Sequence, residues 1–145
     1  MEKIKIAIGS DHGGFNLKRK VAEFLTNEGY EVNDVGTHST ESCDYPIIAR
    51  DVAKKVASGE AVKGIILCGS GVGVSIVANK VKGIRAALCH ESYTARVSRE
   101  HNDSNILCMG ERVTGDALAL DIVKTWLDTP FEGGRHKKRV DMIEE

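Results

Sequence analysis

The sequence predicts an α/β protein, a Rossmann-like three-layer α/β/α sandwich around a five-stranded parallel sheet. Apolar runs typical of strands alternate along the chain with segments whose apolar residues recur at helical spacing. The run at 64–68, GIILC, is apolar at nearly every position, as expected of a strand that is covered on both faces. The chain has 145 residues, which suits one domain with one core, so we predict a single domain over 1–145.

The first half of the chain alternates strand-like and helix-like segments. The apolar run at 3–9, KIKIAIG, predicts the first strand, and YEVNDVG at 30–36 predicts the second. Between them, the segment 15–29 places apolar residues at helical spacing and ends at a glycine, which indicates a helix. The segment 47–60 carries an apolar stripe with a four-residue repeat, so it predicts a second helix before the strand at 64–68.

The second half continues this alternation. The expected elements are strands at 84–89 and 105–110, helices at 74–80, 92–102 and 115–128, and, in the tail at 133–145, a loop followed by a short helix. Pro130 ends the helix before the tail. Strand–helix units repeated in this order are typical of a parallel sheet with helices on both faces.

Charge and hydropathy exclude several classes of partner. The chain has 20 basic and 21 acidic residues and a formal net charge of -1, whereas nucleic acids and anionic membranes favour a basic excess. No stretch is long enough to span a bilayer, and the N-terminus lacks the long apolar region of a signal peptide. We therefore expect a cytoplasmic protein that binds neither nucleic acid nor membrane.

The four cysteines are widely spaced and form no CxxC pair. This spacing favours neither a zinc knuckle nor a disulfide framework. Cys89 and Cys108 lie in apolar runs and are expected to be small buried residues. Cys43 lies in a polar loop, and Cys68 differs from all three because a glycine-rich loop follows it.

Three polar stretches follow predicted strands. Ser10-Asp11-His12 follows the first, the loop after Cys68 follows the third, and Gly110-Glu111-Arg112 follows the fifth. Because ligands bind outside the carboxyl ends of the strands in such sheets, we expect these stretches to share one rim.

The loop after Cys68 reads GSGVGVS and matches no familiar phosphate loop. It lacks the lysine of a P-loop, and its GxGxG spacing differs from the GxGxxG of a dinucleotide site. Val74 stands where a phosphatase-like thiol loop would need arginine. Glycines that lead into a helix still offer free N–H groups, so an anion is the expected occupant.

A thiol at this position has two interpretations. A helix N-terminus lowers the pKa of a cysteine, which makes it a base or a nucleophile. A base beside N–H donors and the Ser70 hydroxyl is what proton abstraction next to a carbonyl requires, because an enediolate forms. The alternative is a buried cysteine at a strand end before a tight turn, and the residues alone leave both open.

Six motifs in order resemble the type B ribose-5-phosphate isomerases, a family related to the galactose-6-phosphate isomerase subunits. They are GSDHGG at 9–14, DYP at 44–46, CGSGVGVSIVANK at 68–80, REHNDSNIL at 99–107, GERV at 110–113 and EGGRHKKRV at 132–140. The resemblance implies an isomerase that interconverts ribose 5-phosphate and ribulose 5-phosphate in the pentose phosphate pathway, with no metal or cofactor. It also implies a homodimer with shared active sites, and leaves open the pairing of dimers into a tetramer. The tail from about 133 would complete the site or the dimer.

The resemblance assigns the proton transfer to the glycine loop. Cys68 stands where one branch of the family carries its base, and Val77 stands where the other branch has glutamate. The loop matches the family's anion hole through Gly69, Ser70, Gly71, Val72 and Gly73. Ser70 replaces a threonine that many members have, and either hydroxyl can donate a hydrogen bond.

The resemblance also supplies the remaining site residues. His101 matches the residue that opens the furanose ring, and an imidazole titrates in the range that this step needs. The expected substrate contacts are Ser10, Asp11, His12, Tyr45, Asn102 and, for the phosphate, Arg112, Arg135 and Arg139. Arg135 and Arg139 are four residues apart and share one face of a helical tail. Structural alternatives are helix capping by Asp11 or Asn102, a surface role for His101, and a solvated basic face in the tail.

Three other functions compete with the ribose enzyme. An isomerase of allose or galactose 6-phosphate would differ only in the depth of the pocket. A non-catalytic sugar-phosphate sensor could use the same fold, but it needs neither a thiol base nor a ring-opening histidine. A thiol redox protein would need a resolving cysteine close to Cys68 in the sequence, and none is there.

Overall fold

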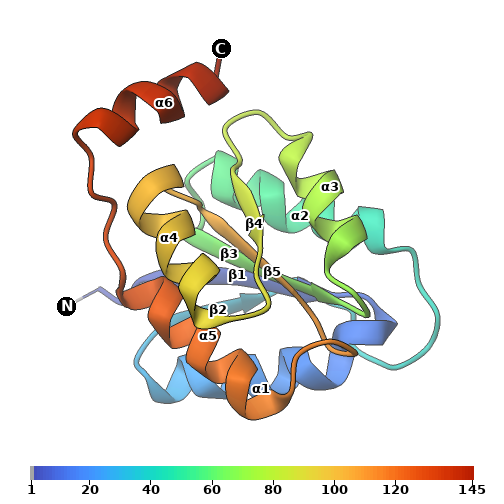
Figure 1. The fold of residues 1–145 in the computed structure, drawn as a ribbon. Coiled ribbons are helices and arrows are strands. Elements are labelled where there is room, and N and C mark those ends of the chain that lie inside the picture. The colour runs from blue at the N-terminus through green and yellow to red at the C-terminus, as the bar shows by residue number, and fades with distance from the viewer. Residues whose placement is uncertain (1) are drawn as a thin grey trace.

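Five parallel strands form one sheet in the computed structural model of the chain, which describes residues 2–145 (Figure 1). The strands are β1 (Lys5–Ser10), β2 (Glu31–Asp34), β3 (Lys63–Cys68), β4 (Ala86–Leu88) and β5 (Ile106–Gly110). Their order across the sheet is β2-β1-β3-β5-β4. The helices are η1 (His12–Gly14, a 3-10 turn), α1 (Phe15–Asn27), α2 (Tyr45–Ala57), α3 (Val72–Asn79), α4 (Ser92–Asn102), α5 (Asp116–Asp128) and α6 (Arg135–Ile143). This arrangement confirms the predicted α/β class with a five-stranded parallel sheet.

Helices cover both faces of the sheet, and each face has its own apolar cluster. On one face, Ile8 of β1 and Leu67 of β3 pack against α1, α4 and α5, with Trp126 fully buried among them. On the other face, Ile66 and its neighbours pack against α2 and α3, which contribute Val52 and Val74. The buried side chains of β3 alternate between the two clusters, as the period of a strand requires. The continuous apolar run GIILC therefore marks a central strand.

Two predicted strands are shorter in the structure. The second covers 31–34 and the fourth 86–88, where the sequence suggested 30–36 and 84–89. Both lie at the edges of the sheet, where only one side is paired. At β4 the free edge of Ala86 is occupied by the Asn79 side chain, which donates to its carbonyl at 3.0 Å and accepts from its N–H at 2.8 Å.

The strand order places a switch point between β1 and β3. The chain winds from β1 outward to β2, then crosses back to β3 and continues toward β5 and β4. In a doubly wound sheet the crevice at such a switch point, outside the carboxyl ends of the strands, is where ligands bind. The loops after β1 and β3 hold two of the three polar stretches that the sequence placed on one rim.

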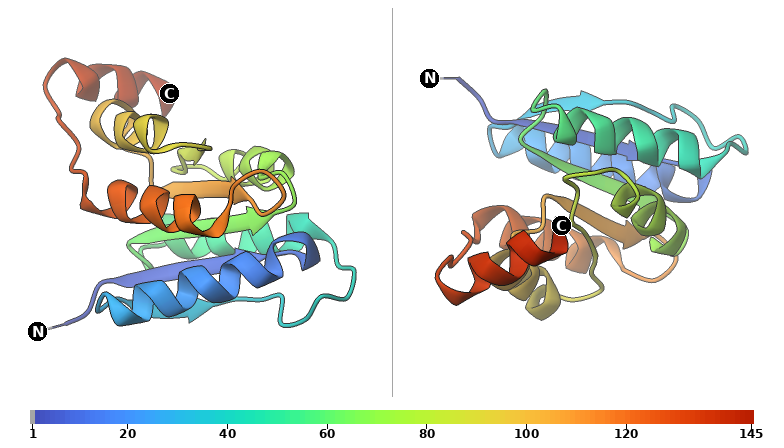
Figure 2. Two further views of the ribbon diagram at one scale, coloured as in Figure 1. Left: turned by 60° about the horizontal axis from the view of Figure 1, so that its bottom comes forward. Right: turned by 90° about the horizontal axis from the view of Figure 1, so that it is seen from above.

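The tail forms a helix that stands apart from the sandwich. α6 packs against α4, and its buried residues are His136 and Val140 (Figures 1 and 2). In the left view of Figure 2 the strand arrows point away from α6, so this helix lies toward the amino ends of the strands. None of the helices described in residues 2–145 is long and apolar enough to cross a membrane.

Candidate active site

An open cleft of about 610 Å³ lies at the carboxyl ends of the strands, and we call it the strand-end cleft. The predicted site residues that line it are Asp11, Tyr45, Cys68, Gly69, Ser70, Val72, Gly73 and Arg112. They come from the loops after β1, β3 and β5 and from the start of α2. The structure thus brings together the three polar stretches that the sequence placed on one rim.

Cys68 is the last residue of β3 and lies at the mouth of the glycine loop. Its side chain is largely buried, with 6% of the residue exposed, but it lines the strand-end cleft. The N–H of Gly71 donates a hydrogen bond to Sγ at 3.0 Å. A donor directed at the sulfur stabilises negative charge there, which suits a thiolate base.

Cys108 of β5 provides a contrast within the same sheet. Burial, and to a smaller extent the nearby Cys68 and Cys89, raises the pKa of the Cys108 thiol far above its ordinary value. Burial likewise raises the pKa of Cys89. These two side chains stay protonated and act as small apolar groups, as their sequence context predicted.

The glycine loop has no room for side chains at two positions. Gly71 has φ +81°, and a Cβ there would lie 2.5 Å from Leu88 and 2.8 Å from the backbone of Met109. A Cβ on Gly73 would lie 2.5 Å from the ring of Tyr45. With this close packing, α3 begins at Val72, and its first N–H groups lie at the cleft. The first N–H groups of any helix have no partner within the helix.

Ser70 is oriented by the loop itself. Its Oγ accepts a hydrogen bond from the N–H of Val72 at 3.2 Å. Because that contact uses an acceptor site of the hydroxyl, its proton is free to be donated toward the cleft.

Asp11 both caps a helical turn and lines the cleft. Its Oδ1 accepts from the N–H groups of Gly13 at 2.9 Å and Gly14 at 3.2 Å, so it caps the turn that begins α1. The same residue lines the strand-end cleft. Ser10, its neighbour, is fully buried, with no hydrogen-bond partner for Oγ, and does not line the cleft.

His12 contacts a segment that the sequence left as loop. Its Nδ1 accepts a hydrogen bond from the N–H of Cys43 at 3.2 Å. The proton of a neutral His12 therefore resides on Nε2. Nothing in the sequence pattern indicated this contact, because it joins residues 31 apart across a polar loop.

Arg112 reaches over the glycine loop. A Cβ on Gly69 would lie 3.2 Å from its Nη1, and its own N–H donates to the carbonyl of Gly69 at 3.0 Å. The N–H of the preceding residue, Glu111, donates to the backbone carbonyl of Cys68 at 2.9 Å, and its Oε1 accepts from the N–H of Leu17 at 2.8 Å. Glu111 thus joins the ends of β3 and β5 to the start of α1, a role that sequence reasoning missed.

Four of the predicted site residues lie on α4 and α6. His101 and Asn102 end α4, and Arg135 and Arg139 lie on α6; none of them lines the strand-end cleft. α4 leads into the amino end of β5, whereas Cys68 is paired with Gly110 at its carboxyl end. The strand between these ends is about 13 Å long. One copy of the chain therefore keeps the two groups at opposite edges of the sheet.

His101 belongs to a small polar group that we call the α4–α6 cluster, made of His101, Glu132 and His136. The two imidazole rings stack with centroids 4.2 Å apart and planes inclined by 12°. Glu132 Oε1 lies 3.3 Å from Nε2 of His136 and 3.9 Å from Nε2 of His101. Both His136 and Glu132 lie in the motif at 132–140, but the sequence assigned neither of them a role.

The α4–α6 cluster is also the one group in residues 2–145 with three ligand atoms close enough for a metal ion, all within 4.8 Å of one another. An imidazole coordinates through a lone pair in the plane of its ring. Two nearly parallel stacked rings direct these lone pairs side by side and do not converge on one ion. The arrangement observed fits an aromatic stack better than a metal centre.

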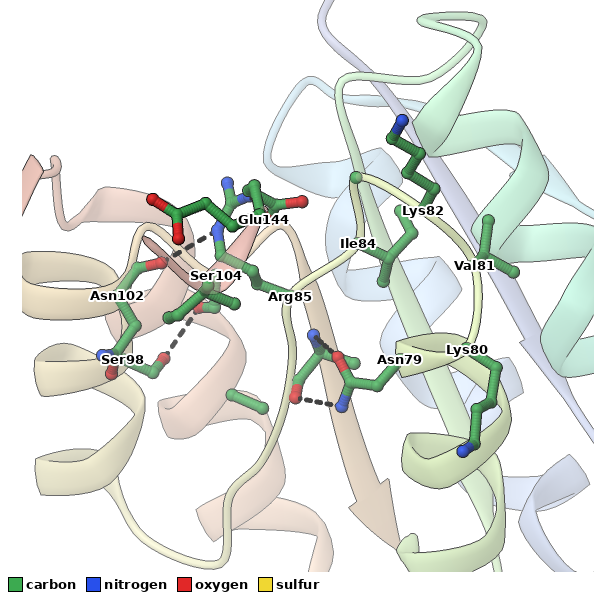
Figure 3. A pocket seen from close by; sticks show the side chains of 15 residues that line it. Asn79, Lys80, Val81, Lys82, Ile84, Arg85, Ser98, Asn102, Ser104 and Glu144 are labelled. Carbon is green, nitrogen blue, oxygen red and sulfur yellow. Dashed lines mark hydrogen bonds and ion pairs between the residues drawn. The ribbon is translucent and has the colours of Figure 1, made fainter. Parts of the chain in front are cut away.

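A second groove, of about 720 Å³, lies beside this cluster (Figure 3). It runs between the end of α3, with Asn79 and Lys82, and the ends of α4 and α6. Asn102 and Glu144 line its far side. There Arg85 donates hydrogen bonds to the carbonyl of Asn102 at 3.0 Å and to the carboxylate of Glu144 at 2.5 Å. The groove thus contains one predicted site residue, Asn102, that does not line the strand-end cleft.

The comparisons with known proteins all match one family of isomerases. A profile described as Ribose/Galactose Isomerase matches residues 6–143. The ribose-5-phosphate isomerase B of Escherichia coli (strain K12) is 53% identical over 139 residues, covering 96% of this chain and 93% of that protein. A structure of Clostridium thermocellum ribose-5-phosphate isomerase B has a TM-score of 0.96 and 62% identity, covering 97% of this chain and 95% of that one. A Thermotoga maritima ribose 5-phosphate isomerase structure has a TM-score of 0.96 and 51% identity, covering 99% of both chains.

Proposed function

Because the chain belongs to the ribose/galactose isomerase family, we propose that it is a type B ribose-5-phosphate isomerase. It interconverts ribose 5-phosphate and ribulose 5-phosphate in pentose phosphate metabolism. The observation that carries the proposal is the placement of Cys68, whose Sγ lines the strand-end cleft and accepts a loop N–H at 3.0 Å. Four free cysteines are consistent with work in the reducing cytoplasm.

The reaction begins with opening of the furanose ring. The ring oxygen gains a proton as its bond to C1 breaks, and the C1 hydroxyl loses one as the aldehyde forms. His101 is the proton donor, because an imidazole exchanges protons readily near neutral pH. Its side chain is 41% exposed at the end of α4, so it is open to a substrate that arrives from outside this chain's own fold.

Cys68 then moves a proton between two carbons. Its thiolate removes the proton from C2, the electron pair forms the C1–C2 double bond, and O1 takes the negative charge of an enediolate. The same sulfur returns the proton to C1. The proton of the C2 hydroxyl passes to O1, so that C2 becomes the ketone and O1 becomes a hydroxyl. The hydroxyl of Ser70 and the first N–H groups of α3 stabilise the anion, since they are fixed before it forms.

Arginines hold the phosphate from two sides. Arg112 lies on the same rim as Cys68, over Gly69. Arg135 and Arg139 are on the exposed side of α6, and Arg side chains suit bidentate contact with phosphate oxygens. Asp11, His12, Tyr45 and Asn102 are the proposed contacts to the sugar hydroxyls and the wall of the site, and Ser10 contributes through its position beneath them.

The active enzyme is a homodimer in which each site draws on both chains. One chain cannot bring His101 and the α6 arginines to its own Cys68, because β5 separates them. The face of α3 beside the cleft exposes the apolar side chains of Val72 and Ile76, at 46% and 56%. In a two-fold dimer this face of one copy fits the groove beside Asn102 of the other, which brings Cys68 and His101 of different chains together.

The first experiment measures the reaction itself. Purified protein is mixed with ribose 5-phosphate, and ketose formation is compared with that from allose 6-phosphate and galactose 6-phosphate as kcat/KM. We expect ribose 5-phosphate to give the highest value. A higher value for a hexose phosphate would reassign the substrate, and turnover of none of the three would favour a non-catalytic sensor.

Subunit mixing tests the shared site. Cys68→Ala and His101→Ala chains are co-expressed with different tags, and the mixed dimer population is assayed. Random pairing makes half of the dimers mixed, and each mixed dimer has one intact site, so we expect about a quarter of wild-type activity. If each site used one chain only, the mixture would show no more activity than its two components measured apart.

A further inference from the structure

His136 and Glu132 have no role in the proton transfers described above, yet both face His101. His136 is in the first turn of α6 and only 7% exposed, which is unusual for a histidine on a short, strongly basic helix. Its ring covers one face of the His101 imidazole at a centroid distance of 4.2 Å. A buried, titratable side chain in contact with a proposed catalytic group calls for a functional explanation.

The stacking partner is held from several directions. The N–H of Glu132 donates to the carbonyl of Glu100 at 3.1 Å, which fixes the segment before α6 against the last turn of α4. The Glu132 carboxylate then lies 3.3 Å from His136 Nε2. At the far end of α6, Glu144 pairs with Arg85 at 2.5 Å. His136 is therefore anchored at both ends of its helix.

His101 lacks comparable support of its own. It lies in the last turn of α4, and its side chain is 41% exposed. Its Nε2 lies 3.9 Å from Oε1 of Glu132, which is too far for a hydrogen bond. Without the stacked ring, its χ angles would be free to sample several rotamers, and a proton donor must be held in one orientation to act efficiently.

We propose that His136, oriented by Glu132, is the positioning residue of the ring-opening His101. The inference rests on the proposed function, since it names the residue that prepares the first step of that reaction. The stack fixes the plane of the His101 ring, and Glu132 limits its rotation from the side. His136 itself does not touch the substrate.

A double-mutant cycle tests whether His136 acts through His101. We expect His136→Ala alone to lower kcat on ribose 5-phosphate about tenfold, as for the loss of one aromatic stacking contact. In a His101→Ala background, whose residual turnover uses sugar that has opened in solution, the same change should have almost no effect. Strong coupling between the two substitutions identifies residues that work as a unit.

Val140→Ala is the matched structural control. Val140 lies one turn beyond His136, is equally buried at 7%, and anchors the same helix against α4. If it loosens α6, it should lower kcat by the same factor in the wild-type and the His101→Ala backgrounds. Glu132→Gln is the second test variant, because its side chain is 49% exposed and its loss does not threaten folding.

The outcomes are distinct. Coupling for His136→Ala or Glu132→Gln, without coupling for Val140→Ala, supports the proposal. Equal losses in both backgrounds for both test variants would overturn it and leave His136 a structural residue. Absence of ribose 5-phosphate turnover in the wild-type protein would instead reject the proposed function, on which the inference depends.

Discussion

The strand-end cleft is shaped by the backbone, whereas the α4–α6 cluster is held by side chains on an added helix. In the cleft, the backbone packs so closely at Gly71 and Gly73 that neither position has space for a Cβ. In the cluster, a ring stack, one carboxylate and buried Val140 hold α6 against α4. The difference predicts that changes in the cleft abolish activity, while changes in the cluster produce graded losses.

The largest effect is expected for Cys68→Ala. Loss of the base should lower kcat by about 10³-fold or more, because general base catalysis contributes about 10²–10⁴-fold and nothing else in the cleft replaces it. The variant should fold, since the sulfur makes a single hydrogen bond, and should still bind ribose 5-phosphate by calorimetry. Near-normal turnover would remove the thiol from the mechanism.

Cys108→Ala is the control for that substitution. It deletes a sulfur of the same size from the neighbouring strand, where Cys108 is fully buried and its pKa is raised by burial. We expect kcat within about twofold of the wild type and a melting temperature lower by a few degrees, as for a small cavity.

The second largest effect is expected for Gly71→Ala. A side chain at φ +81° is strained, and this one would also overlap Leu88 and the backbone of Met109. The loop must shift, which moves the N–H away from Cys68 Sγ and the donors away from the enediolate. We expect kcat to fall about 10²-fold, the size of losing one preorganised oxyanion donor.

Gly59→Ala tests the backbone strain of a positive φ without the displacement of neighbouring atoms. Gly59 has φ +82°, nearly that of Gly71, but nothing lies within 4 Å of a Cβ there. It should cost about 1 kcal/mol of stability and leave kcat unchanged. If both glycine variants lost activity equally, the tight packing of the loop would not be what matters.

The sequence predicted the strand-end cleft better than the cluster, and the reason is physical. Cleft residues follow strands directly, and parallel strands end at one edge, so order along the chain gives proximity. Ser10 illustrates the limit of that rule, because the alternation of β1 places it on the same side as Ile6 and Ile8 and buries it. It remains a predicted substrate contact that the structure does not bring into the cleft.

The α4–α6 cluster depends on packing that no local pattern encodes. α6 is short and strongly polar, so the burial of His136 follows only from its seat on α4. Glu132 lies in an irregular segment and meets His101 through folding of the tail. The resemblance supplied His101, Asn102, Arg135 and Arg139 as site residues, but their place at the opposite edge of the sheet came from the structure.

Arg139→Ala should have a smaller, graded effect. The side chain is exposed on α6 and contacts the phosphate only across the proposed dimer, so its loss should raise KM about tenfold or more while kcat changes little. Lys138→Ala removes the same charge from the next position and should leave KM within about twofold. If Arg139→Ala changed only the melting temperature, the tail would have a structural role. If Arg139→Ala and Lys138→Ala raised KM equally, the effect would be general electrostatic attraction.

The smallest expected effect concerns Lys63, the first residue of the central strand β3. Burial, and secondarily the nearby charge of Arg99, lowers the pKa of the Lys63 ammonium from 10.5 to about 8, and Asp103 opposes the shift. Its Nζ lies 5.3 Å from the centroid of the Trp126 ring. The unfolded chain therefore keeps a proton that the folded chain has lost between about pH 8 and 10.5, and this group makes the protein more stable as the pH rises through that window.

Lys63→Met should consequently stabilise the protein at pH 7 and lose this advantage by pH 10.5, as measured by urea unfolding at both pH values. Lys124→Met, on α5, is the control of opposite sign. Hydrogen bonds to Glu28 and Asp128 raise the pKa of Lys124, so its contribution is present at pH 7 and is lost as the pH rises through its folded pKa. A constant difference between Lys63→Met and the wild type across this range would mean that the ammonium is solvated in the folded chain.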